Sequence, residues 1–240
     1  MRYCLIILAS ILFIHPLRAQ EMSKVEAEYF PILTQKTPKG VVLETSGLAF
    51  LPDGKLAVAT RRGEVWLLDK WDTEQPDFTL FANGLHEPLG LAWYEGDLLT
   101  TQRSEVTRLG DRNKDGRADK YETVSSWPLT ANYHEYSYGP ELLPNGDMMI
   151  TLNVGWEGGG VSKSPWRGWM MRITQEGELK PYAAGMRSPA GFGFNAEGDI
   201  FYAENQGDWV GSGRMTHMEE GDFAGHPASL NWANEEGSTV

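Results

Sequence analysis

Residues Asp111 to Glu122, with the sequence DRNKDGRADKYE, have the side chains and the spacing of a calcium-binding loop. Such twelve-residue loops supply oxygen ligands from positions 1, 3, 5, 7, 9 and 12, and they need glycine at position 6. The matching ligand positions are Asp111, Asn113, Asp115, Arg117 through its carbonyl group, Asp119 and Glu122. The pattern therefore predicts a structural calcium site. A turn that Asp, Asn and Gly merely shape is the alternative.

A second group of residues could carry acid–base and anion-binding chemistry. His134, within NYHEYS (132–137), is the candidate general base, because imidazole exchanges protons near neutral pH. His86 has a similar setting, and either histidine could instead bond a neighbouring loop. Arg187, within GMRSPAG (185–191), could hold an anionic ligand or tie two loops together. Glu204, Asn205 and Asp208, within ENQGDW (204–209), could bind a hard cation or form a polar turn.

A repeat of short strands must position these residues. SGLAFLPDGKLAVATRRGEVWLLD (46–69) aligns with LGLAWYEGDLLTTQRSEVTRLGD (89–111), and looser copies begin near Gly139 and Gly191. The aligned glycines, which include Gly47 and Gly90, recur at intervals of roughly 40–50 residues, the period of propeller blades. Turns such as Asp53-Gly54 are hairpin signals. The sequence therefore predicts an all-β β-propeller of four-stranded antiparallel blades, with four blades in this chain.

Propeller topology sorts the loops onto two faces. Turns between the first and second strands share a face with loops between the third and fourth strands, which include the calcium-like loop. The opposite face receives the segments that enter each first strand, with Glu44, His86, His134 and Arg187. We therefore predict a polar small-molecule pocket on that second face. The repeated Arg62 and Arg103, by contrast, are predicted to make structural bonds between blades.

Bulk properties restrict the setting of the protein. The net charge of −12 argues against nucleic acid as a partner. Residues 1–19 read as a cleaved signal peptide, 20–43 as a lead-in segment and 44–240 as the propeller domain. The only cysteine, Cys4, lies in the signal, so the mature chain has no disulfide or cysteine-ligated metal. We therefore expect an exported protein, periplasmic or secreted, without a membrane span in its mature part.

Three stretches resemble a known family. YHEYSYGPELLPNGDMMI (133–150), AAGMRSPAGFGFNAEGDIFYAENQGD (183–208) and EEGDFAGHP (219–227) are similar to segments of soluble quinoprotein glucose dehydrogenases and glucose/sorbosone dehydrogenase-type propellers. The resemblance implies a six-bladed propeller that binds pyrroloquinoline quinone (PQQ) and calcium. It implies oxidation of a sugar or alcohol, with a cytochrome c as an electron acceptor.

The same resemblance assigns roles to individual residues. His134 would take the proton of the substrate hydroxyl group while hydride passes to the quinone. Arg187 would contact the quinone oxygens, next to Ser188, which stands where the family has Asn. Glu204, Asn205 and Gln206 would lie near the cofactor and its calcium ion.

Two other classes of function use the same fold and face. A metal-dependent lactonase-type hydrolase would need oxygen ligands that converge on one ion, for which Glu44, Asn153 and Asn205 are available. A non-catalytic propeller would use the pocket to hold a glycan or a protein partner. Quinone-independent lactone hydrolysis would favour the first of these, and ligand binding without turnover would favour the second.

Overall fold

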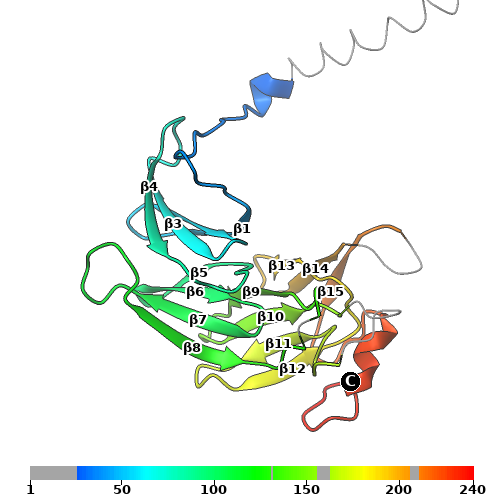
Figure 1. Cartoon of the computed structure of the whole chain (residues 1–240). Helices are drawn as coiled ribbons and strands as arrows, with labels where there is room; N and C mark the ends of the chain where they lie inside the picture. The colour runs from blue at the N-terminus through cyan, green and yellow to red at the C-terminus, as the bar shows by residue number, and fades with distance from the viewer. Residues whose placement is uncertain (1–25, 131, 156–162, 206–210) are drawn as a thin grey trace, which may run out of the picture. The chain divides into compact units, whose positions relative to one another are not determined.

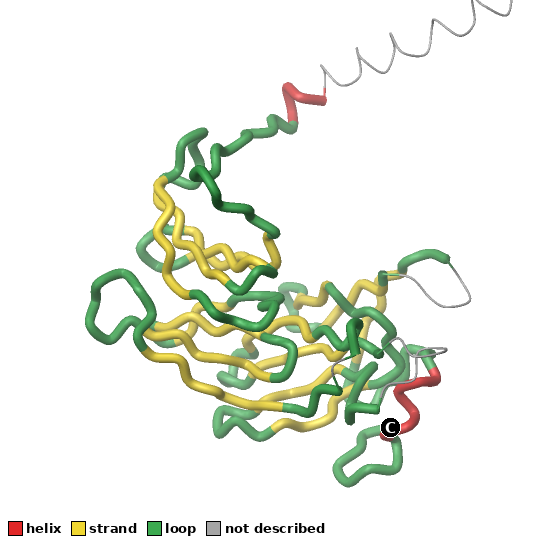
Figure 2. The backbone as a smooth tube through the Cα atoms, in the orientation of Figure 1, coloured by secondary structure: helices red, strands yellow, loops and turns green. Residues whose placement is uncertain are grey.

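The computed structural model describes residues 26–130, 132–155, 163–205 and 211–240. The predicted signal peptide, Gln206 and Asp208 lie outside these residues. Residues 26–36 and 70–76 form a small compact unit of their own, in which the amide of Lys36 donates to the carbonyl of Glu74 (3.0 Å). The second unit comprises residues 37–69 and 77–240 and contains every described strand. Helix is confined to short segments, as Figure 2 shows.

Within the described residues the second unit forms four antiparallel sheets, which we call blades one to four. Blade one contains β1 (Thr45–Phe50), β2 (Leu56–Thr60), β3 (Glu64–Asp69) and β4 (Asp77–Ala82). Blade two contains β5 (Ala92–Tyr94), β6 (Asp97–Thr101), β7 (Glu105–Gly110) and β8 (Lys120–Ser126). Blade three contains β9 (Ser137–Leu142), β10 (Met148–Leu152), β11 (Met170–Ile173) and β12 (Leu179–Ala183). Blade four contains β13 (Gly191–Phe194), β14 (Ile200–Glu204) and β15 (Arg214–Met218).

The order of strands in each blade follows the chain, and the first strands β1, β5, β9 and β13 contact one another in succession (Figure 1). This arrangement confirms the predicted all-β propeller fold. Blade four differs from the other three, because no fourth strand follows β15 in the described residues. The chain instead returns to blade three, where Ala184 pairs with Phe223, and the 3₁₀ helix η1 (Pro227–Trp232) follows.

Each pair of neighbouring blades encloses its own apolar core. The core between blades one and two is centred on Val65, Leu91 and Leu98, and the next is centred on Leu99, Ile150 and Trp169. A methionine-rich core that includes Met149 and Met170 lies between blades three and four. Adjacent residues of one strand serve different cores, because successive side chains of a strand point to opposite faces.

The aligned glycines lie where the first strands approach most closely. A Cβ atom on Gly47 would lie 2.6 Å from the Cα atom of Gly90, and one on Gly90 would overlap the carbonyl oxygen of Gly139. Gly139 in turn faces the ring of Phe192, because a Cβ atom on Gly139 would lie 3.2 Å from the Cζ atom of that ring. Gly90 and Gly139 also have positive φ angles. The sequence repeat therefore reflects a steric requirement at the blade junctions.

Candidate functional site

A cleft of about 440 Å³ lies where the first strands of all four blades begin. Its lining includes the residue directly before each aligned glycine, and in chain order these residues are Ser46, Leu89, Tyr138 and Ala190. Glu44, Thr45 and Arg61 complete the lining. We call this the axial cleft. It lies on the face for which the sequence predicts a pocket.

The segments that enter the four blades are each tied to the loop after the second strand of the same blade. Arg61 forms an ion pair with Glu44 (3.1 Å), and the side chain of Gln102 accepts from the amide of His86. The equivalent bond in blade three comes from Asn153, whose Nδ2 donates to the carbonyl of His134 (3.0 Å), and in blade four from Glu204, the last residue of β14.

Glu204 anchors the segment that contains Arg187. Its carboxylate accepts from the amides of Arg187 (2.8 Å), Ser188 (2.8 Å) and Asn205 (3.1 Å). The described members of the predicted cofactor set are thus neighbours in space, with Glu204 as their centre. Three backbone donors occupy this carboxylate, so its observed role is to shape the loop.

His134 is half-buried and sits in a segment that side chains of other loops hold in place. Its amide donates to Oδ1 of Asn132 (2.9 Å), and its ring meets that of Tyr133 edge to face at 4.6 Å. The carbonyl of Arg187 accepts from the amide of Val154, the residue after Asn153. Consecutive residues of one loop therefore bind the segments of His134 and Arg187, which places both segments on one face as predicted.

Two buried arginines bind the backbone on either side of His134. Arg103 donates to the carbonyls of Asn132 (2.6 Å) and Tyr133 (2.9 Å). Arg167, which is fully buried, donates to the carbonyl of Tyr136 (2.8 Å). Burial lowers the pKa of Arg167 to about 10, while the charge of Glu135 acts in the opposite direction. These bonds fix where the histidine lies.

Arg103 also links blades, as the sequence predicts. Its guanidinium pairs with Glu87 (2.7 Å) and lies over the ring of Tyr136, 4.8 Å from the centroid. Arg62 lies 3.9 Å from Glu44, and Arg61, not Arg62, connects Glu44 with Glu87 (3.2 Å). The result is a chain of alternating charges along the rim of the axial cleft.

Tyr138 and Arg167 are the site residues that sequence reasoning missed. Tyr138 lines the axial cleft, and burial raises its pKa to about 12, so its hydroxyl group stays protonated at neutral pH. Its place directly before Gly139 was a usable signal, because the residue before the aligned glycine lines the axial cleft in every blade. Arg167 had no such signal, since an isolated arginine in a loop is usually exposed.

The calcium-like loop joins β7 to β8 at the opposite end of blade two, as predicted. The side chain of Arg112 in this loop pairs with Asp97 (2.6 Å), the first residue of β6, whereas Arg103 follows the end of β6. The carboxylates accept backbone amides of the loop: Asp111 from Lys114 (2.7 Å) and Asp119 from Arg112 (2.8 Å). Among the described residues no group of three or more His, Cys, Asp or Glu side chains is arranged to hold a metal. Calcium binding at Asp111–Glu122 stays a prediction.

Residues 54–238 match the profile of a domain family of unknown function, DUF7133. The chain belongs to this family. Among curated proteins, none matches the sequence.

Solved structures of low sequence identity share the fold of this DUF7133 chain. A protein assigned as an oxidoreductase (glucose dehydrogenase) from Thermus thermophilus is 21% identical, with a TM-score of 0.62, over 79% of this chain and 66% of its own. The PQQ-bound aldose sugar dehydrogenase of Streptomyces coelicolor is 18% identical, with a TM-score of 0.63, over 86% and 67%. The chain thus spans about two thirds of each. These likenesses confirm the propeller fold that the resemblance implied.

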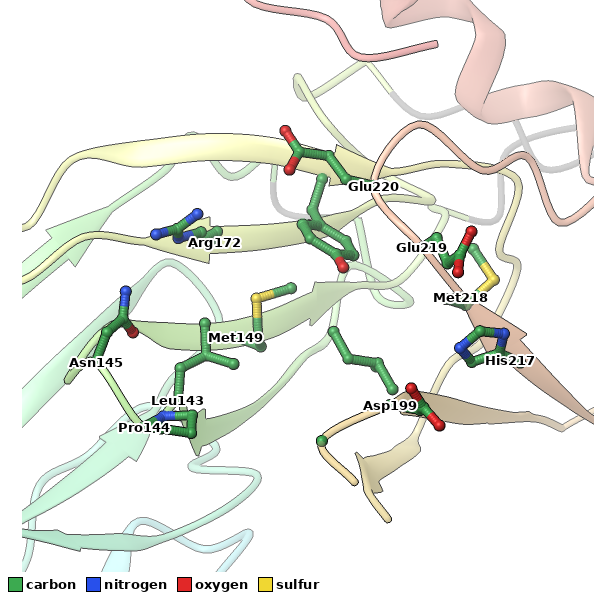
Figure 3. Close-up of a pocket in the computed structure, with 13 residues that line it drawn as sticks. Leu143, Pro144, Asn145, Met149, Arg172, Asp199, His217, Met218, Glu219 and Glu220 are labelled. Atoms are coloured by element: carbon green, nitrogen blue, oxygen red, sulfur yellow. The ribbon is translucent and has the colours of Figure 1, made fainter. Parts of the chain in front are cut away.

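A second cleft of the DUF7133 chain, of about 460 Å³, lies between blades three and four (Figure 3). It lies at the turn-bearing end of the blades, where the turns between first and second strands are found. Arg172 and Asn145 stand on one wall, and Asp199, His217 and Glu219 stand on the other. Burial and the nearby charges of Glu220 and Glu219 raise the pKa of Tyr182, another lining residue. None of the predicted site residues lines this cleft.

In the described part of the chain, no helix has the length and apolar character to cross a membrane.

Proposed function

We propose that this chain is an oxidoreductase that converts a hydroxyl group of a sugar or another alcohol to a carbonyl group at the axial cleft. One observation carries the proposal: all four blades contribute to the lining of one cleft, and the segment of His134, which leads into the lining residue Tyr138, is held by three side chains from two loops. Bonds of this kind pre-organise a site for chemistry. Sugar dehydrogenases of the same fold support the choice of reaction.

The residues of the axial cleft suit PQQ, the cofactor bound by the Streptomyces coelicolor protein. The lining of the cleft includes the guanidinium of Arg61 and the hydroxyl of Tyr138, hydrogen-bond donors that match carboxylate and carbonyl oxygens. Arg187 would add a third donor from the neighbouring segment. Glu44 already pairs with Arg61, so a carboxylated ligand has to replace that bond with its own. When bound, the quinone supplies a hydride acceptor.

The chain itself contributes orientation and proton transfer. An imidazole nitrogen of His134 would take the proton of the substrate hydroxyl group, as a positioned base does. Loss of that proton from the hydroxyl oxygen, together with a hydride from the carbon that bears the hydroxyl group, leaves a carbonyl product. Tyr138 remains a neutral hydrogen-bond donor throughout, because its pKa is about 12. The two electrons would then pass to an acceptor such as a cytochrome c.

Reconstitution tests the proposal. The purified chain is mixed with PQQ and calcium, quinone binding is followed by fluorescence quenching, and reduction of an artificial electron acceptor is followed over a panel of sugars and alcohols. His134→Gln is expected to lower turnover by about 10²–10⁴-fold with quinone binding retained. His86→Gln, the equivalent histidine of blade two, is the matched control and should keep its turnover. Absence of both quinone binding and turnover in the unmodified chain would reject the proposal.

A hydrolase of the lactonase type is the second candidate, and one observation favours it. Within the described residues, Oδ1 of Asn153 is buried without a hydrogen-bond partner, and Asn153 binds the His134 segment. An amide oxygen of this kind can bind a hard cation, together with Glu44 and Asn205. Calcium-dependent lactone hydrolysis that Asn153→Ala abolishes, with no effect of quinone, would establish this alternative. Sugar binding without any turnover would instead show a non-catalytic propeller.

Calcium in the Asp111–Glu122 loop is proposed as a structural ion of blade two. Carboxylates that now accept loop amides would turn to the ion, which would stiffen the β7–β8 connection. We expect calcium to raise the melting temperature of the chain and magnesium to do so less. Asp115→Asn should remove the calcium effect, whereas Asp53→Asn, in the β1–β2 turn, should not. An equal response of all three proteins would contradict the site.

Export is proposed from the composition of residues 1–19. The measurement is the N-terminus of the protein recovered outside the cytoplasm of an expressing bacterium. A start at Gln20 is expected. Full retention in the cytoplasm with Met1 intact would overturn this assignment.

A further inference from the structure

Glu87 stands between two arginines that belong to different blades. Its carboxylate pairs with Arg61 of blade one (3.2 Å) and with Arg103 of blade two (2.7 Å). Arg61 lines the axial cleft, and Arg103 binds the two carbonyl groups that precede His134. Glu87 itself is not among the described residues that line the cleft. It therefore connects an arginine of the cleft with the support of the His134 segment.

The backbone of Glu87 has a conformation that a glutamate rarely adopts. Its φ angle is 47°, in the left-handed region, where the Cβ atom of an L-residue is crowded. Backbone hydrogen bonds on both sides hold this conformation: the amide of Leu85 donates to the carbonyl of Gly63 (3.1 Å) in blade one, and the amide of Leu89 donates to the carbonyl of Thr101 (2.8 Å) in blade two. The fold thus imposes strain at the residue that carries the carboxylate, and such strain is concentrated at functional sites.

The two ion pairs of Glu87 differ in their surroundings. The side chain of Arg103 is 9% exposed, whereas that of Arg61 is 46% exposed. A buried guanidinium depends on its carboxylate much more than an exposed one does. The pair with Arg103 is therefore the firm one, and the pair with Arg61 can be exchanged. Because Arg61 also pairs with Glu44 (3.1 Å), an anion that takes Arg61 has to displace both carboxylates.

We propose that Glu87 is a positioning residue that couples the occupation of the axial cleft by an anionic ligand to the placement of His134. An anion that binds Arg61 draws this guanidinium away from Glu87, and the carboxylate of Glu87 then serves Arg103 alone. Arg103 in turn holds the two carbonyl groups that precede His134. Ligand binding and order in the His134 segment therefore favour each other. The effect on turnover rests on the proposed function, whereas the effect on the order of this segment does not.

The first measurement needs no ligand. Hydrogen exchange of the amides of residues 132–137 is followed by mass spectrometry in the parent chain and in two variants. Glu87→Gln removes the charge that holds Arg103 and should speed this exchange by about tenfold or more. Arg61→Gln reproduces the withdrawal of the half-exposed Arg61 and should slow it by about twofold. An exchange rate in Arg61→Gln no slower than in the parent, or an unchanged rate in Glu87→Gln, would overturn the proposal.

Glu95→Gln is the matched control for these exchange rates. Glu95 also has a positive φ angle (49°) and also lies near an arginine, Arg108 (3.8 Å). It belongs to the turn between β5 and β6, at the other end of blade two. Exchange in residues 132–137 should therefore be the same in Glu95→Gln as in the parent. Acceleration there equal to that of Glu87→Gln would show a general loss of stability and contradict the coupling.

The second measurement uses PQQ binding and turnover. Glu87→Gln removes a negative charge beside Arg61, so PQQ should bind about threefold more tightly, while turnover falls about tenfold because His134 is less well placed. A residue with a purely structural role would weaken both together. Parent-like binding and turnover in Glu87→Gln would reject the coupling and leave the proposed function intact. A parent chain without PQQ binding or turnover would reject the proposed function, and the exchange rates would then decide the coupling alone.

Discussion

At the scale of single residues, glycines set the spacing of the blades. Gly90 combines a positive φ of 138° with a neighbour so close that a Cβ would overlap the carbonyl oxygen of Gly139. The carbonyl belongs to the backbone of the next blade and has little freedom to move. Any side chain added at position 90 would therefore push the first strands of blades two and three apart.

Gly90→Ala should lower the free energy of unfolding by about 3 kcal/mol or more, because it adds both backbone strain and a steric clash. Gly191→Ala is the matched control, since its Cβ would meet nothing among the described residues. Urea denaturation of the two variants provides the comparison. Equal stability of the two would show that the glycine series has no steric basis.

Arg103 is the residue on which the position of His134 depends most. It binds two consecutive carbonyls just before the histidine and pairs with Glu87. Arg103→Lys keeps the charge but cannot make the forked set of bonds. We expect turnover at the axial cleft to fall by about tenfold, with a shifted pH profile, at a stability cost of about 1–2 kcal/mol. An unchanged pH profile with only lower stability would show that Arg103 stabilises the fold and does not influence the reaction.

At the scale of elements, charged pairs fasten the turn-bearing ends of the blades. Asp97 is almost fully buried at the start of β6 and pairs with Arg108 (2.5 Å) and Arg112 (2.6 Å). Burial raises the pKa of Asp97, but the hydrogen bonds from Arg112 and Arg108 outweigh burial and leave the pKa below its usual range. Asp147 holds Arg172 in blade three in the same way.

A lowered pKa in the folded state means that Asp97 stabilises the fold above its unfolded-state pKa of about 3.9. That contribution is lost as the pH falls through the lower, folded-state value. Asp97→Asn should therefore reduce stability at pH 7 and flatten the decline of stability below about pH 4. Thermal unfolding as a function of pH measures both effects. A variant with the same acid-induced decline as the parent would contradict the assignment.

At the scale of the whole molecule, burial is concentrated in the second strand of each blade. All five residues of β6 and of β10 are buried, whereas most of β8 is exposed. Protection of backbone amides follows buried, well-packed strands. Hydrogen exchange should therefore be slowest in β6 and β10 and faster in β8 and β15. Faster exchange in β10 than in β8 would show that the blades do not share the cores described above.

The sequence by itself determined the repeat, the strand pairing and the sorting of loops onto two faces. Hairpin turns such as Asp53-Gly54 and alternating apolar residues are local signals, and blade connectivity follows from the order of strands. Local information therefore sufficed to place the His134 and Arg187 segments opposite the Asp111–Glu122 loop.

Only the tertiary structure decided what the polar residues touch. Glu204 could have bound a cation by its sequence, but three amides brought together by the fold occupy its carboxylate. Arg167 became a buried support for the His134 segment through contacts with residues some thirty positions away. Such partners are distant in the chain, and hydrogen bonds and charge pairs act over a few ångströms in space, so spacing along the sequence carries no record of them.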